Sequence, residues 1–423
     1  MKWKVVRFGA GSLAAALLSV QSNGAEAQQF HGLTVGTYAP CDFGCTPFPP
    51  VTVSAAEIDN MFNAATNILR DDVDGAGDAD QFCDVSLFRQ QEVEPFMAGD
   101  GDVDSNEDFW NVSEYGSSYG HTNFVKIVRS ITYCGRTGFF EGCAPIGPRN
   151  SVVITEGAVR SAGAGFVLAH EVGHSVSLGH QDGSPENIMY PYVLSSAHGV
   201  WPWQCSAYNA PVDGDGPGYN PFTPRGPMDA TAKFPQDDHP RMDFSGVSIE
   251  EAAHRTYVDL VPAEVADYYG DEDVAVLTRM LHDPREADHH AKIAQLIGLI
   301  ASGRDTRHTS ALLELVKSRA AARDAHASAT ISLGYLAHRG DHAAFSFLAH
   351  HARDIKSPVV AWAIQALGLS GREDARAELS RLERDADDDE KSARPGRARR
   401  LFRQALRDND DVRGRGLRAY YGR

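Results

Sequence analysis

The chain has 423 residues, with 57 acidic residues against 40 basic ones and a formal net charge of −17. Binding to phosphate backbones depends on clustered lysine and arginine side chains, so this charge balance argues against nucleic acid as a partner. The length is sufficient for two or three domains with substantial apolar cores.

Residues 1–27 have the features of a secretory signal peptide. Three basic residues precede the apolar stretch 8–20, and the small-residue site Ala25-Glu26-Ala27 follows it. No later segment has the ~20 uninterrupted apolar residues of a membrane span. The sequence therefore predicts a mature chain that begins near residue 28 and is secreted, with the periplasm as an alternative location.

The next segments alternate between strand and helix patterns, which indicates a mixed α/β unit. Residues 33–38, 85–88, 124–131 and 151–155 are rich in the residue types of strands. Between the first two, Ser54 and Glu57 have the spacing of a capping box at the start of a helix. Apolar residues at helical spacing predict the buried face of that helix: Ile58, Met61, Phe62, Ala65 and Leu69.

Two stretches within this unit are rich in aspartate, at residues 71–80 and 100–108. Alternating aspartates in glycine-containing loops suit Ca²⁺, which takes about six to eight oxygen ligands. In the second stretch, however, Ser105 and Asn111 replace the glycine and the final glutamate of the twelve-residue calcium-binding loop. A structural calcium site and a plain solvated acidic loop therefore both stay open as interpretations.

All six cysteines lie in the first half of the chain: Cys41, Cys45, Cys83, Cys134, Cys143 and Cys205. An even number of cysteines in an exported protein favours disulfides over metal clusters. Their closeness in sequence makes Cys134 and Cys143 the most plausible pair. The other pairings cannot be assigned from the sequence.

A histidine cluster follows at residues 170–180. His170 and His174 are four residues apart, so on a helix they share one face with Cβ atoms roughly 5–6 Å apart, a spacing that suits two ligands of one zinc ion. Glu171 lies on the same helix, turned aside from them, where it can hold a water molecule bound to the metal. Gly179 is expected to end the helix, since a left-handed residue there needs no Cβ, so that His180 supplies a third ligand. Three protein ligands leave one position open, as in catalytic zinc sites.

Together with Met189, this cluster resembles the signature of the metzincin zinc endopeptidases, H-E-x-x-H-x-x-G-x-x-H followed by a Met-turn. Residues 187–191 (NIMYP) resemble the Met-turn, in the order closest to the matrixin branch. The resemblance implies that Met189 is an apolar floor under the metal rather than a ligand. It also implies three zinc ligands and one general base: His170, His174, His180 and Glu171.

One position departs from the signature, because Ser177 stands where the family has glycine. If the tight turn of the family lies at Ser177, a serine in a left-handed conformation carries a modest strain cost. Gly179 is the alternative place for this turn.

The metzincin resemblance also implies a place where substrate binds. In that family an edge strand, which pairs antiparallel with substrate, lies just before the strand that precedes the zinc helix. Residues 138–145 occupy this place, and Pro145 suits an edge better than the centre of a sheet. An edge strand grips an extended peptide through its open N–H and C=O groups. A hairpin pinned by a disulfide is an equally weighted alternative for these residues.

The second half of the chain has the pattern of helical repeats. Ser248 and Glu251 form a second capping box, which predicts the last helix of the catalytic unit and a boundary near residue 262. Beyond it, similar Ala- and Leu-rich pieces recur around Gly298, Gly334 and Gly368, at intervals of 36 and 34 residues. This period resembles short HEAT-like repeats and predicts an α-solenoid, in which the glycines allow neighbouring helices to pack closely.

Many histidines fall in this second half: His289, His290, His308, His338, His350 and His351. None has the partner spacing or acidic neighbour of a site in the sequence, so we expect them to be solvated or packed.

These features predict an α+β metzincin-like catalytic domain, with a mixed twisted sheet, a zinc helix and a Met-turn, followed by an all-α helical-repeat domain. The expected divisions are a signal peptide at 1–27, the zinc protease domain at 28–262 and the repeats at 263–423. The expected activity is that of a secreted zinc metalloendopeptidase on protein or peptide substrates. The alternative is an extracellular scaffold protein, in which the solenoid recognises a protein partner and the zinc domain is inactive.

Overall fold

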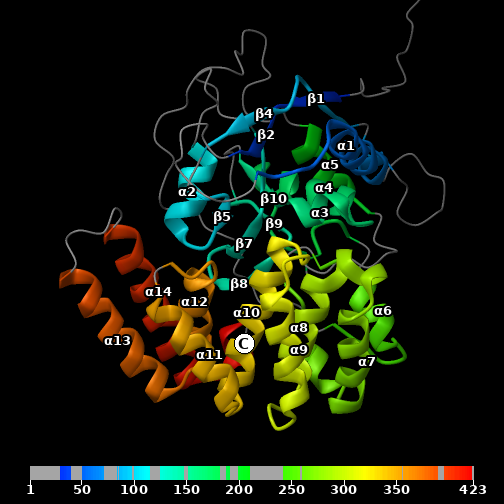
Figure 1. The fold of residues 1–423 in the computed structure, drawn as a ribbon. Helices are drawn as coiled ribbons and strands as arrows, with labels where there is room; N and C mark the ends of the chain where they lie inside the picture. The colour runs from blue at the N-terminus through cyan, green and yellow to red at the C-terminus, as the bar shows by residue number, and fades with distance from the viewer. Residues whose placement is uncertain are drawn as a thin grey trace, which may run out of the picture.

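A computed structural model of the chain, shown in Figure 1, describes residues 29–39, 50–70, 83, 85–97, 100–114, 124–146, 151–181, 187–190, 199–209, 242–257, 260–354, 356–388 and 395–421. The predicted signal peptide at 1–27, the acidic stretch 71–80 and the cysteines Cys41 and Cys45 lie outside these residues. The described part has mixed strand and helix content up to α6 and is helical from there to its C-terminal end.

The largest sheet has five strands among the described residues, in the order β4 (Glu94–Phe96), β2 (Val35–Tyr38), β6 (Val125–Val128), β10 (Val152–Thr155) and β9 (Gly142–Cys143). The first four run parallel to their neighbours, whereas β9 pairs antiparallel with β10 and forms the edge. Residues 138–145 therefore contain an edge strand, β9, and its pairing with substrate stays a prediction. The alternative is also present, because residues 130–140 form a hairpin next to the Cys134–Cys143 disulfide.

Two smaller sheets complete the strands. β1 (Gln29–Leu33) pairs parallel with β3 (Val85–Arg89). In the other, β7 (Ser130–Tyr133) lies between β5 (Asp102–Val103) and β8 (Thr137–Phe140). The antiparallel hairpin of β7 and β8 leads directly into β9, and the predicted disulfide between Cys134 and Cys143 is confirmed.

The strands predicted at residues 33–38 and 124–131 are present, but each range is interrupted by one residue and divided between two sheets. Thr34 separates β1 from β2, because its hydroxyl accepts the backbone N–H of Phe124 and the chain changes from one sheet to the other. Arg129 separates β6 from β7, since its guanidinium reaches the carboxylate of Asp102 at 2.7 Å.

Helix α1 (Ala55–Arg70) begins with the predicted capping box. The N–H of Ser54 donates to Glu57 Oε2 at 2.7 Å, and the N–H of Glu57 donates to Ser54 Oγ at 3.2 Å. All the predicted apolar positions of this helix are buried. They pack against α4 (Ala164–Ser175), while the remaining short helices of this half are α2 (Asn106–Glu114), α3 (Glu156–Arg160) and α5 (Pro202–Asn209).

The C-terminal half consists of helices stacked in two layers (Figure 1). One layer contains α8 (His290–Ile300), α10 (Arg323–His338), α12 (Val360–Leu369) and α14 (Pro395–Arg415). The other contains α7 (Asp271–Leu281), α9 (Thr306–Lys317), α11 (His342–Arg353) and α13 (Glu373–Asp388). Almost every residue of α8, α10 and α12 is buried, whereas α9 and α11 bury one face, as expected for an inner and an outer layer.

Three short elements complete this half: α6 (Ile249–His254), which begins with the predicted Ser248 cap, η2 (Ala263–Asp267) and η3 (Pro284–His289). The last helix is α15 (Leu417–Tyr420).

The recurring glycines lie where successive helices of the inner layer approach each other. A Cβ at Gly334 would lie 2.5 Å from the carbonyl oxygen of Ala366, and one at Gly368 would lie 2.7 Å from that of Ala405. A Cβ at Gly298 would lie 2.5 Å from Cβ of Ser332. The predicted close approach at the three glycines is therefore confirmed, and only glycine allows it.

The helical layers are attached to the strand-containing half by buried ionic contacts. Asp102, at the start of β5, accepts hydrogen bonds from Arg129 at 2.7 Å and from Arg323 of α10 at 3.0 Å. The Arg323 guanidinium also lies 3.9 Å from the ring centroid of Trp362. A buried carboxylate needs such partners, because the cost of desolvating its charge is otherwise several kcal/mol.

Further hydrogen bonds and a shared core join the same two halves. The amide of Gln365 donates to the carbonyl of Asp104 at 2.7 Å, and the hydroxyl of Thr137 donates to Asp408 at 2.7 Å. Residues on both sides of position 262 belong to one apolar core, which combines the repeats with Phe139, Tyr190, Met242 and Phe244. The boundary at 262 stays a prediction, but it does not separate two independent cores.

Within the described part of the chain, no helix combines the length and the apolar character needed to cross a membrane.

Asp324 makes the contact between the halves sensitive to pH. It is buried at the start of α10, and burial raises the pKa of its carboxyl to about 7, with the charges of Glu156 and Glu141 acting in the same direction. In the unfolded chain an aspartate has a pKa of about 3.9. Between these values the folded protein binds one more proton than the unfolded chain, so stability falls as the pH rises.

Asp324→Asn removes this titration. Between pH 5 and pH 8 we expect the free energy of unfolding of the unmodified protein to decrease. The decrease in the variant should be smaller by about 2 kcal/mol. Urea denaturation of both proteins at the two pH values, in the same buffers, measures the difference. Equal pH dependence in the two proteins would contradict the assignment.

Candidate metal centre

Helix α4 carries His170, Glu171 and His174, and it is buried along its whole length. Its packing against α1 depends on Gly165, where a Cβ would lie 2.6 Å from the Cβ of Ala64. Because the helix is surrounded by protein, its polar residues need defined partners or ligands.

The structure brings the three predicted ligands together. Ring centroids are 4.5 Å apart for His170 and His174, 4.9 Å for His174 and His180, and 5.3 Å for His170 and His180. One ring nitrogen from each histidine lies within 4.8 Å of the corresponding atoms of the other two. His170 and His174 are fully buried and His180 is half-buried, so the cluster reaches solvent on the side of His180.

Hydrogen bonds to backbone carbonyls orient two of the rings. Nδ1 of His170 lies 2.8 Å from the carbonyl oxygen of Ile188, and Nδ1 of His174 lies 2.8 Å from that of Leu178. A carbonyl oxygen only accepts, so in both rings Nδ1 carries the proton. The lone pair is then on Nε2, which is the arrangement of metal-binding histidines held by an outer hydrogen bond.

The turn that ends α4 lies at Ser177, and the prediction of a left-handed Gly179 is wrong. Ser177 has φ of 73°, the only non-glycine residue with a positive φ in the described part of the chain, whereas Gly179 is not among the glycines with positive φ. The N–H of Ser177 donates to His174 O and that of Leu178 donates to Gly173 O, each at 2.9 Å. This pair of bonds is a Schellman motif, and it positions the carbonyl of Leu178 beside the ring of His174.

The Met-turn connects the first ligand with the third. The carbonyl of its residue Ile188 accepts a hydrogen bond from His170, and the carbonyl of Met189 accepts the N–H of Gln181, directly after His180, at 2.9 Å. Met189 is fully buried, and a Cβ at Gly173 of α4 would overlap its sulfur. The expected position of Met189 as an apolar floor under the histidine helix agrees with these contacts.

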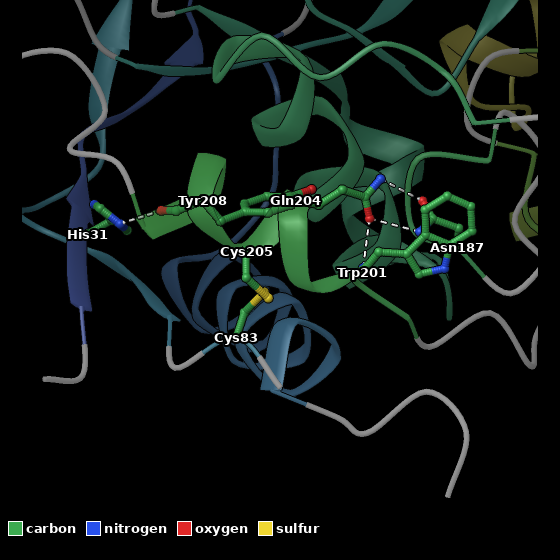
Figure 2. Close-up of a disulfide and its surroundings, with 7 residues drawn as sticks. All are labelled: His31, Cys83, Asn187, Trp201, Gln204, Cys205 and Tyr208. Atoms are coloured by element: carbon green, nitrogen blue, oxygen red, sulfur yellow. Dashed lines mark hydrogen bonds between the residues drawn. A yellow bond between two sulfur atoms is a disulfide. The ribbon is translucent and has the colours of Figure 1, made fainter. Parts of the chain in front are cut away.

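A hydrogen-bonded network holds the Met-turn in place (Figure 2). The side-chain amides of Asn187 and Gln204 bond to each other at 2.8 and 3.0 Å, and Gln204 Oε1 also accepts the N–H of Trp201 at 2.9 Å. Asn187 Oδ1 in turn accepts the N–H of Met189 at 2.9 Å. This network fixes the turn from the side of α5.

A disulfide and the hydrogen bonds of Tyr208 hold helix α5 in place. Cys205 forms a disulfide with Cys83, a pairing that the sequence did not reveal (Figure 2). The hydroxyl of Tyr208 donates to the carbonyl of Ala169 at 2.9 Å, and the carbonyl of Tyr208 bonds to His31 at 2.9 Å. Burial and then the nearby charge of Glu171 raise the pKa of Tyr208, which therefore remains a neutral phenol.

The edge strand lies directly against Glu171. A Cβ at Gly142 of β9 would lie 2.6 Å from Glu171 Oε1, so glycine is needed for the strand to approach the carboxylate. Glu171 is buried and directly follows His170 in α4. The sequence identified Glu171 from its motif, whereas its neighbour Gly142 and the two carbonyl acceptors carry no sequence signal.

The residues present fit a zinc ion. Three imidazoles are a donor set that zinc prefers, and the Nδ1 hydrogen bonds present Nε2 of two of them as ligands. Sequence reasoning and geometry agree on the same residues as the set that could hold a metal: His170, His174 and His180.

Aspartates of the second acidic stretch, residues 100–108, form hydrogen bonds and ion pairs within the protein. Asp102 bonds to two arginines, and Asp108 accepts the hydroxyl of Ser105 at 2.5 Å at the start of α2. Asp102, Asp104 and Asp108 are buried, which does not fit a solvated loop. They are also not part of a metal-ligating cluster among the described residues, so this stretch gives the calcium interpretation no support. The first acidic stretch, at 71–80, lies outside the described residues.

A second group of potential ligands contains His254, Glu286 and His289. The expectation that His289 has no acidic partner is wrong, because Glu286 precedes it by three residues and lies on the same side of η3. That spacing was visible in the sequence, but the approach of His254 depends on the tertiary fold.

No protein-family model matches this sequence, and no curated protein matches it either.

The strain at Ser177 can be measured. A left-handed conformation costs a non-glycine residue about 1–2 kcal/mol. Glycine removes this strain but lowers stability by about 0.4–1 kcal/mol, because the unfolded chain gains conformational entropy. Ser177→Gly is therefore expected to raise the free energy of unfolding by about 0.5–1 kcal/mol in urea denaturation.

Gly179→Ala is the matched control, because nothing lies within 4 Å of a Cβ at Gly179. We expect it to be neutral or slightly stabilising. Destabilisation by Gly179→Ala, together with no gain from Ser177→Gly, would place the left-handed turn at residue 179 instead.

Proposed function

We propose that this protein is a zinc-dependent endopeptidase. The observation that carries the proposal is the convergence of three imidazoles, with ligand atoms within 4.8 Å of one another, two of them on the helix that also carries the buried Glu171. A sheet with one antiparallel edge strand and a buried Met189 beneath the histidine helix are also what the metzincin resemblance implies.

The chemistry follows from the roles of the residues. Zinc held by His170, His174 and His180 would supply a Lewis acid that polarises a carbonyl and lowers the pKa of a water molecule from about 15.7 toward about 7. Glu171 would accept the proton of the attacking water as general base and then donate it to the leaving amine nitrogen. The outer hydrogen bonds to Ile188 and Leu178 would keep the ligand rings in one orientation throughout.

The edge strand β9 supports a peptide as the substrate. Thr155 N–H donates to the carbonyl of Glu141 at 3.0 Å, so by the alternation of a β-ladder Gly142 directs its own N–H and C=O away from β10. No strand pairs with this outer side within the described part of the chain. An extended peptide that bonds to Gly142 would lie next to Glu171, which Gly142 contacts.

We further propose that the protein acts outside the cytoplasm. Two disulfides, Cys83–Cys205 and Cys134–Cys143, are compatible with an oxidising compartment, and the sequence of residues 1–27 predicts export.

The alternative is a scaffold protein with an inactive zinc domain, whose repeats bind a partner. The presence of Glu171 argues against it, because a site without catalysis has no use for a general base. Incubation of the purified protein with unfolded protein substrates, with and without a chelator, distinguishes the two functions. Cleavage that a chelator abolishes and added zinc restores supports the endopeptidase. Absence of cleavage by fully zinc-loaded protein supports the scaffold.

Glu171→Gln tests the mechanism directly. The variant keeps the shape of the side chain but cannot take up a proton, so we expect kcat/KM for a peptide substrate to fall by at least about 100-fold. Zinc content, measured by plasma mass spectrometry, is expected to remain unchanged.

Two further variants serve as controls for Glu171→Gln. His174→Ala is expected to lose zinc and activity together. His338→Ala is expected to keep both, since His338 lies in the repeats and bonds to the carbonyl of Ser370. Substantial turnover by Glu171→Gln would exclude Glu171 as the general base.

Gly142→Ala tests the contact between the edge strand and Glu171. The new Cβ would displace the carboxylate, and a displacement of about 1 Å is enough to reduce catalysis by up to about 100-fold. We expect a loss of kcat with unchanged zinc content. Gly414→Ala is the matched control, because nothing lies within 4 Å of a Cβ at that position. Unchanged kcat in Gly142→Ala would show that the carboxylate does not depend on this contact.

A further inference from the structure

The side chains of His254, Glu286 and His289 gather where α6 meets η3, away from the α4 cluster. His254 Nε2 lies 2.7 Å from Glu286 Oε2, and the ring centroids of His254 and His289 are 4.6 Å apart. One ligand atom from each of the three lies within 4.8 Å of the others. The centroid distance of His254 and His289 lies within the range of 4.5–5.3 Å found among His170, His174 and His180.

The polarity of His289 is not otherwise satisfied. Its Nδ1 is buried and has no hydrogen-bond partner among the residues that the structure describes. An imidazole nitrogen buried without a partner is costly, and a metal ion is one ligand that satisfies it. His254 is more exposed, with 44% of its side chain accessible, so an ion can enter from solvent.

The neighbouring cation does not prevent binding of a metal. Lys292 is one helical turn beyond His289, but its ammonium donates to the carbonyl of Arg255 at 2.6 Å and lies 3.5 Å from the carboxylate of Glu141. Its charge is therefore offset by Glu141. The guanidinium of Arg255 likewise bonds to Glu251, at 2.8 Å.

We propose that His254, Glu286 and His289 form a second metal site, which binds a zinc-class divalent ion and cross-links α6 to η3. Two imidazoles and one carboxylate suit zinc and its neighbours in the transition series, whereas calcium and magnesium prefer oxygen ligands. Binding replaces the contact between His254 and Glu286 by bonds from each to the ion, and any proton held between them is released to solvent.

The position of this site gives it a structural role. α6 and η3 both belong to the helical half and lie on either side of residue 262, so the ion joins two elements of that half. Through the helical turn from His289 to Lys292 it also supports the contact of Lys292 with Glu141, next to Gly142 of the edge strand.

The test is a zinc titration of the full mature protein, with zinc chloride as the probe and plasma mass spectrometry to count bound ions. We expect two zinc ions per chain in the unmodified protein. The double variant Glu286→Gln/His289→Gln is expected to bind one, with the dissociation constant of the second ion raised at least tenfold. His174→Ala is expected to lose the ion of the α4 cluster and to keep the other.

A matched control is the exposed pair of His282 and Glu314, which are 3.2 Å apart and lack a third ligand in the described part of the chain. The double variant His282→Gln/Glu314→Gln should keep both ions. If the Glu286→Gln/His289→Gln protein does not fold by circular dichroism, the exposed His254→Asn provides the same test.

Cobalt gives a second readout independent of activity. In His174→Ala, Co²⁺ at the second site should give visible d–d absorbance that Glu286→Gln/His289→Gln abolishes. One ion per chain in the unmodified protein would overturn the proposal. Two ions of unchanged affinity in Glu286→Gln/His289→Gln or His254→Asn would also overturn it.

Discussion

Two hydrogen bonds, from Nδ1 of His170 to Ile188 and from Nδ1 of His174 to Leu178, determine how the histidine cluster is built. Both acceptors are backbone carbonyls that follow α4 in the chain, one in the Met-turn and one in the turn that ends the helix. The orientation of the ligand rings is therefore set by the path of the main chain. The same path places His180, because the residue after it bonds to Met189. The Met-turn therefore helps to position both His170 and His180.

Close approach of the backbone is the second requirement of the site. Gly165 brings α4 against α1, Gly173 makes room for the sulfur of Met189, and Gly142 brings the edge strand to Glu171. At each place a methyl group would displace a neighbour that the site needs. The same principle recurs in the repeats, where Gly334 and Gly368 bring successive helices into contact. Small residues thus control the geometry in both halves of the molecule.

Features with a local cause could be predicted from the sequence, namely the histidine spacing on one helix, the capping box at Ser54 and the Cys134–Cys143 disulfide. Features that depend on distant partners could not. Asp102 resembles a calcium ligand in the sequence but bonds to Arg129 and Arg323, and Cys83 pairs across 122 residues. The sequence leaves the left-handed turn open between Ser177 and Gly179. Intrinsic preference favours glycine, yet the left-handed residue is Ser177, where the Schellman hydrogen bonds form.

Tyr190 follows Met189 directly, and its side chain belongs to the apolar core of the helical repeats, together with Phe139 of β8. A gene fusion that exchanged the repeats for another domain would have to supply a matching apolar surface for both residues. The two halves are therefore expected to have diverged as a pair, so that substitutions in the inner helical layer are constrained by the turn beneath the histidines.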